Sequence, residues 1–216
     1  MAALSSIYGK YDCANASTYA YNEKGERIFV GENGIIRRWI DGSNIKLWID
    51  ENTFRDQMEA NQAYDATDQA AARWTRIGSQ VDAPVHFWMV SPPEKAKVVM
   101  RFSPNPEKPT WIASTLLPRE GEIPLWIYPR FFTYGAAGQA GILAHEMGHI
   151  MGLRHEFLEP ALSPKFQVGP INPTSVMSDT LPYTIQETDR ALLKVFYEMH
   201  SSPSEDFKFE IIPIDV

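Results

Sequence analysis

The sequence predicts an α+β protein. The prediction is based on the order of its strand-like and helix-like segments. Short runs rich in β-branched and aromatic residues fill most of the first 130 positions, separated by Gly, Pro, Asp and Asn. Apolar residues at helical spacing follow residue 53, precede residue 152 and follow residue 184. With 44% hydrophobic and 22% charged residues, the 216-residue chain can bury an ordinary core. That length suits one domain, or two small lobes around a cleft.

The first predicted elements are strands followed by a long helix. Residues 18–30 and 35–50 are each typical of two short strands around a polar turn, and Asp41-Gly42 is a hairpin signal. Thr53 is a suitable cap for the helix, with Asp56 where a capping box has a carboxylate. The helix runs to about Ile77. Its predicted apolar face is Phe54, Met58, Ala66, Ala70, Trp74 and Ile77.

Further strands and two helices complete the expected order. Strands are predicted at residues 85–90, 96–102, 110–117 and 122–129. Pro124 implies that the last of these starts there or lies at a sheet edge. Residues 134–152 predict a helix of small residues, and a Pro-rich irregular stretch follows. Thr184 to Glu187 match a capping box before a final helix. The tail at 207–216 is strand-like, and the sequence leaves open whether it docks as an edge strand or crosses a cleft.

Composition excludes several classes of partner. The net charge is -7, and no run of five basic residues appears, so a nucleic acid is not expected. The apolar runs are too short to span a bilayer, so no membrane partner is expected, and we expect a monomer. No signal peptide is visible in residues 1–12, which fits either an intracellular protein or a leader already removed. Cys13 is the only cysteine and cannot form an intrachain disulfide.

Three of the five histidines lie within eleven residues of one another, in the segment HEMGHIMGLRH at 145–155. Four residues on a helix span about 400°, so His145 and His149 point to nearly the same side and can bind one Zn²⁺. Glu146 lies one step around the helix. A catalytic zinc needs a third protein ligand. His155 can supply it if the chain reverses, and Gly152 is suited to reverse a helix end at positive φ.

This segment resembles the H-E-x-x-H-x-x-G-x-x-H signature of the metzincin zinc endopeptidases. Ser175-Val176-Met177-Ser178 looks like the methionine turn of that group, and Glu156 after the third histidine is similar to the astacin-like branch. The resemblance covers most of residues 35–199. It implies a metzincin-like zincin: an N-terminal twisted, mostly parallel sheet with backing and active-site helices, and a smaller irregular C-terminal lobe ending in a helix.

The resemblance also implies an activity and roles for particular residues. His145, His149 and His155 would ligate Zn²⁺, and Glu146 would be the general base that activates water to hydrolyse a protein or peptide substrate. Met177 would pack beneath the histidines without binding the metal. The strand at 110–117 would be the edge strand beside the cleft, where an extended peptide can pair.

Three further residues are candidates around the metal. Many astacin-like enzymes have a tyrosine two residues after the turn methionine, but this chain has Asp179 there. Tyr183 is the nearest downstream tyrosine, and it could act on the oxyanion or serve as a structural residue. Cys13 could occupy the fourth zinc position as a latency ligand, or be an ordinary unpaired cysteine. Glu156 could meet a processed N-terminus or pair with a nearby base.

The expected organisation is an N-terminal extension at 1–34 that resembles a pro-segment, a catalytic domain at 35–200 divided near residue 152, and a tail at 201–216. A secreted protein is expected, with a cytoplasmic location left open. Two other functions compete with an active endopeptidase. One is a catalytically weak zinc-binding fold that serves as a binding or effector module. The other is a peptidase whose third ligand is a later glutamate, which Gly152, His155 and Met177 together disfavour.

Overall fold

The computed structural model describes residues 35–40, 42–80, 86–91, 93–105, 107, 109–155, 172–178, 183–198 and 210–215. Several sequence predictions fall elsewhere in the chain. The strands at 18–30, Cys13, Glu156 and Asp179 lie outside the described residues.

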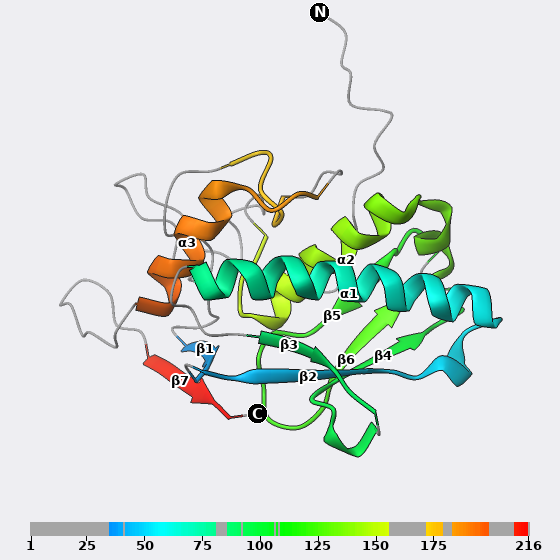
Figure 1. Ribbon diagram of the computed structural model, residues 1–216, viewed down its shortest axis with the longest axis horizontal. Helices are drawn as coiled ribbons and strands as arrows, with labels where there is room; N and C mark the ends of the chain where they lie inside the picture. The colour runs from blue at the N-terminus through cyan, green and yellow to red at the C-terminus, as the bar shows by residue number, and fades with distance from the viewer. Residues whose placement is uncertain are drawn as a thin grey trace, which may run out of the picture.

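A five-stranded sheet forms the base of the fold (Figure 1). Its strands are β2 (Asn44–Ile49), β3 (His86–Met89), β4 (Val98–Phe102), β5 (Ala113–Thr115) and β6 (Ile123–Ile127). They are ordered β3-β2-β4-β6-β5, and every pair is parallel except β5 with β6. Consecutive buried residues in β4 show that the centre of the sheet is covered on both faces, as parallel sheets require.

Three helices accompany this sheet: α1 (Gln57–Gln80), α2 (Ala136–Ile150) and α3 (Glu187–Glu198). Helices α1 and α2 lie side by side, while α3 lies on the side of the molecule away from the start of α1 (Figure 1). Three short 3₁₀ helices, η1 (Glu51–Thr53), η2 (Pro93–Lys95) and η3 (Pro129–Thr133), connect these elements. The predicted α+β class, with a mostly parallel sheet and a C-terminal helix, is confirmed.

The predicted hairpin at Asp41-Gly42 is wrong. Gly42 does turn the chain with φ of 88°, and the Ser43 N–H donates to the Ile40 carbonyl. However, β1 (Ile35–Trp39) pairs in parallel with β7 (Glu210–Ile214), and β2 joins the larger sheet. A turn signal fixes only the local direction of the chain, whereas strand partners are set by where each apolar face can be buried. The tail therefore docks as a strand along β1.

Helix α1 begins later than the capping signal at Thr53 suggested. The Asp56 side chain caps it, because its Oδ1 accepts the Glu59 N–H at 2.9 Å. The Thr53 hydroxyl accepts the Phe102 N–H and so fixes η1 to β4. Met58 was predicted on the apolar face, but 65% of it is exposed. The buried face is instead made of small residues and one large one: Ala60, Ala63, Ala66, Thr67, Ala70 and Trp74.

The strands near α2 partly match their predictions. The strand predicted at 110–117 is shorter, Ala113–Thr115, and is confirmed as an edge strand of the sheet. Pro124 is the second residue of β6, which confirms that the strand starts near it, but β6 lies between β4 and β5 and is not an edge. No described helix is both long and apolar enough to cross a membrane.

Two residues of β1 hold the ends of two helices. The Trp39 indole N–H donates to the Ile150 carbonyl at 2.7 Å, at the C-terminal end of α2. The Arg38 guanidinium donates to the carbonyls of Phe196 and Tyr197 at 2.7 and 2.8 Å, at the C-terminal end of α3. Since the last carbonyls of a helix lack partners within it, these side chains both satisfy and position the two helix ends.

Candidate metal centre

Helix α2 is the buried element that carries the first two histidines. Every residue from Gln139 to Ile150 is buried, which is possible because alanines and glycines let neighbouring segments approach the helix closely. The Trp74 indole N–H donates to the Ala144 carbonyl at 2.7 Å and so anchors α2 to α1. His145 and His149 are both 0% exposed.

The C-terminal end of α2 reverses as the sequence predicted. Gly152 has φ of 105°, its N–H donates to the His149 carbonyl at 2.9 Å, and the Leu153 N–H donates to the Gly148 carbonyl at 3.0 Å. This pair of bonds is a Schellman motif with glycine in the left-handed position. The reversal returns His155 to the side of the helix that carries the other two rings.

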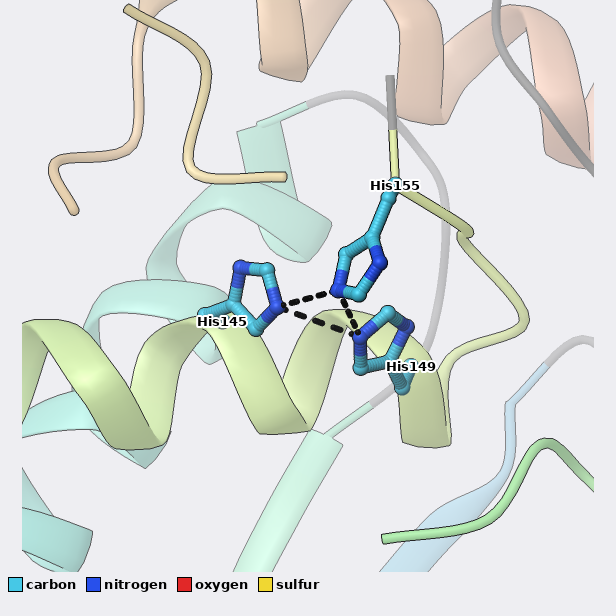
Figure 2. Close-up of side chains that lie close together, drawn as sticks. All are labelled: His145, His149 and His155. Atoms are coloured by element: carbon cyan, nitrogen blue, oxygen red, sulfur yellow. Dashed lines mark hydrogen bonds between the residues drawn. The ribbon is translucent and has the colours of Figure 1, made fainter. Parts of the chain in front are cut away.

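The three imidazoles converge on one point (Figure 2). The Nε2 atoms of His145 and His155 are 2.9 Å apart, those of His149 and His155 are 3.0 Å apart, and those of His145 and His149 are 3.1 Å apart. The structure thus brings together the three histidines that the sequence grouped as candidate metal ligands.

The other ring nitrogens fix the protonation of two of these rings. Nδ1 of His145 lies 2.7 Å from the Val176 carbonyl oxygen, and Nδ1 of His149 lies 2.8 Å from the Leu153 carbonyl oxygen. A carbonyl oxygen only accepts, so both Nδ1 atoms carry the proton. In neutral rings both Nε2 atoms then present lone pairs to each other across 3.1 Å. Two lone pairs that face each other at this distance can bind one cation together.

His145 itself does not hold that cation as a proton near pH 7. Burial lowers the pKa of His145 to about 4, against the raising effect of its bond to Val176, so this ring is neutral near pH 7. A divalent metal could be bound by all three rings at once. Zn²⁺ binds imidazole nitrogen at about 2.0–2.1 Å, and nitrogens spaced 2.9–3.1 Å apart share a point at that distance. The three histidines thus fit a zinc centre with a position left for another ligand.

The methionine turn lies directly against α2. Gly148 leaves room for it, because a Cβ atom there would lie 2.3 Å from the Met177 sulfur. Met177 is 3% exposed, consistent with its predicted packing beneath the histidines.

A buried carboxylate holds that turn in place. Oδ1 of Asp189, on α3, accepts the Ser175 hydroxyl at 2.5 Å. Its Oδ2 accepts the N–H groups of Val176 at 3.1 Å and Gln186 at 2.6 Å. Since Val176 in turn accepts from His145, Asp189 connects the start of α3 to the orientation of a candidate metal ligand.

Sequence reasoning missed Asp189, although a signal was present. Asp189 shares one face of α3 with Leu192, Leu193 and Phe196, and a carboxylate on an apolar helix face needs buried donors. The capping box predicted at Thr184 and Glu187 is displaced by two residues, because α3 begins at Glu187. There the Asp189 carboxylate accepts the Gln186 N–H, which is one of the two bonds of such a box.

The remaining candidates occupy distinct places. Glu146 is fully buried on α2, next to His145 in the chain. The Tyr183 ring packs on the His145 ring, with 4.5 Å between centroids, and is 2% exposed. The fourth histidine that the structure describes, His86, is half-buried on β3, at the opposite edge of the sheet from β5, and is not part of the cluster.

The fold and the cluster together define an α+β protein with a buried three-histidine site that could hold a metal ion. Two solved structures of myroilysin have a similar fold. One matches with a TM-score of 0.52 and 13% identity over 78% of this chain and 92% of that chain. The other matches with a TM-score of 0.52 and 12% identity over 76% of this chain and 96% of that chain. No family model matches the sequence. No curated protein matches it significantly.

Proposed function

We propose that this protein is a zinc-dependent endopeptidase. The observation that carries the proposal is the pair of fixed tautomers at His145 and His149, which aim two lone pairs at one point. His155 completes a set of three neutral nitrogen ligands, the ligand set of a catalytic zinc that keeps an open position. The fold shared with myroilysin supports the same reading.

Bound zinc would supply an electrophile for the scissile carbonyl and lower the pKa of water to near 7. The chain's own residues do the rest. The rings of His145 and His149 keep their orientation because their Nδ1–H groups donate to backbone carbonyls. Glu146 accepts a proton from water and passes it to the leaving amine. Because Glu146 is fully buried, its carboxylate acts in a site that excludes bulk solvent.

Tyr183 has a more restricted proposed role. Its ring stacks on His145, which supports a function in shaping the wall of the site. Contact of its hydroxyl with an oxyanion remains a prediction, as does pairing of an extended peptide with β5. Secretion and membership of the astacin-like branch are likewise predictions; the evidence for that branch is Glu156 in the sequence.

The experiment is a matched pair of variants of the zinc-loaded protein, assayed on a quenched peptide library with and without a chelator. Glu146→Gln keeps the size and burial of the side chain but cannot accept the proton. We expect it to bind zinc as the wild type does and to lose activity by at least about 10²-fold. His149→Gln should lose both zinc and activity.

The competing function is a zinc-binding module without catalysis. The wild-type protein would then bind one zinc, cleave no peptide in the library, and show no difference from Glu146→Gln. Undiminished cleavage by Glu146→Gln would refute the role given to that residue.

A further inference from the structure

A cavity of about 370 Å³ opens beside the metal centre, between the C-terminal half of α1 and the start of α2. Residues that line it include Arg73, Arg76, Ala137, Gly138, Tyr183 and Thr184. Its volume lies at the small end of the range for ligand sites, which suits one side chain better than a cofactor.

Helix geometry places this cavity on the metal-binding side of α2. Gly138 precedes His145 by seven residues, which is about 700° of rotation and a rise of about 10 Å. The two residues therefore face nearly the same way, two turns apart. An extended peptide that reaches the histidines can extend along α2 toward the cavity.

Tyr183 forms the wall between the metal centre and the cavity. Its ring packs on His145, and it also lines the cavity. Its backbone lies so close to α2 that a Cβ atom on Gly141 would be 2.6 Å from the Tyr183 carbonyl oxygen. The cavity thus lies on the other side of Tyr183 from the proposed catalytic site, and the close contact of Tyr183 with α2 fixes its position.

The charge of the cavity is opposite to that of the whole chain. The net charge of the protein is -7, yet among the described lining residues the charged side chains are Arg73 and Arg76. They are three residues apart on α1 and so project to the same side of the helix. The adjacent start of α2 adds a partial positive charge. Guanidinium groups recognise carboxylates through paired N–H donors.

We infer that this cavity is a subsite for a carboxylate of the substrate, and that the enzyme prefers an acidic side chain near the scissile bond. The inference rests on the proposed peptidase function. An acidic side chain fits this site better than the C-terminal carboxylate of a residue joined directly to the scissile bond. One extended residue spans only about 3.3 Å, whereas the cavity lies roughly three times farther from His145.

The test compares quenched peptides that differ only by Glu or Gln at each position flanking the cleavage site, with free and amidated C-termini. We expect kcat/KM for the preferred Glu peptide to exceed that of its Gln partner by about ten- to hundredfold, whether or not the C-terminus is amidated. In Arg73→Gln/Arg76→Gln this ratio should fall toward one, with cleavage of the Gln peptide retained. Arg73→Lys should keep part of the preference.

Arg55→Gln is the matched control. It removes one exposed arginine near the opposite end of α1, more than 20 Å from the cavity by helix rise, and should leave the ratio unchanged. A wild-type ratio near one at every position, or an unchanged ratio in the double variant, overturns the subsite while the peptidase function stands. Dependence on a free C-terminus alone would overturn the side-chain assignment.

A binding measurement separates failure of the subsite from failure of the proposed function. If the wild type cleaves nothing, the acetylated, amidated Glu and Gln peptides are titrated into the zinc-loaded protein while the Gly138 amide is followed by NMR. Tighter binding of the Glu peptide, lost in the double variant, supports the carboxylate site without catalysis. Equal binding overturns it.

Discussion

Asp189 makes the sharpest prediction about how the metal centre is held. Its carboxylate accepts three buried donors, from the Ser175 hydroxyl and the N–H groups of Val176 and Gln186. Asp189→Ala removes all three acceptor contacts at once. A buried donor left without a partner costs about 1–3 kcal/mol, so the three together predict a loss of roughly 3–9 kcal/mol of unfolding free energy. That is a large part of the ~5–15 kcal/mol typical of a whole domain.

The lower part of this range is the better expectation. Burial raises the pKa of Asp189 even though its three hydrogen bonds act to lower it, so desolvation offsets part of what those bonds contribute. Asp189→Asn should cost only about 1 kcal/mol. Its amide oxygen can keep the two N–H donors, and the Ser175 hydroxyl can reverse its role and accept from the amide nitrogen.

The assays are urea unfolding of the chelator-treated protein and zinc affinity by competition with a chromophoric chelator. Because Val176 orients the His145 ring, Asp189→Ala should also weaken zinc binding by about 10- to 100-fold. Glu187→Ala is the control, since this carboxylate is in the same helical turn but pairs with Arg190 at the surface. An alanine variant within about 1 kcal/mol of wild type, with unchanged zinc affinity, would refute the reasoning.

Three other predictions follow from the packing and burial of α2. Gly148→Ala places a methyl group 2.3 Å from the Met177 sulfur, so we expect about 1–3 kcal/mol of destabilisation and weaker zinc binding in the same two assays. Gly135→Ala is the control, because its methyl group meets nothing within 4 Å and should change neither stability nor zinc affinity. Gly152→Ala forces a side chain to adopt φ of 105° with its Cβ 3.1 Å from the Arg37 carbonyl oxygen, and should lower the urea midpoint by the equivalent of 1 kcal/mol or more. In the chelator-treated protein, the pKa of His145 is about 4 in the folded state and about 6.5 in the unfolded state. The unfolding free energy should therefore be highest above pH 6.5 and fall by about 3 kcal/mol as the pH drops to 4. An unfolding free energy that stays constant between pH 6.5 and pH 4 would contradict the burial of this ring.

The metal centre could be predicted from the sequence because it is encoded locally. His145 and His149 are related by helix periodicity alone, and Gly152 specifies its own backbone conformation. The edge strand β5 and the order of the helices were also predictable, since each follows from a short pattern. These features need no knowledge of distant partners.

The features that could not be predicted from the sequence depend on pairs of residues far apart in the chain. The turn at Gly42 was recognised, but nothing local says that β1 pairs with residues 210–214 instead of β2. Asp189 was missed because its donors, other than the Gln186 N–H, come from a segment more than ten residues away. Arg73 is an ordinary helix residue until folding brings it to the start of α2.

The hydrogen bonds from β1 have a consequence for the order of events in folding. Trp39 reaches the end of α2 across 111 residues, and Arg38 reaches the end of α3 across 158. Closing such long loops is slow relative to helix formation, so we expect the helices to form before β1 docks. The strand that secures both helix ends would then be a late contributor. Zinc added during refolding should be captured in a phase slower than the appearance of helical signal, and substitution of Trp39 should slow that phase selectively.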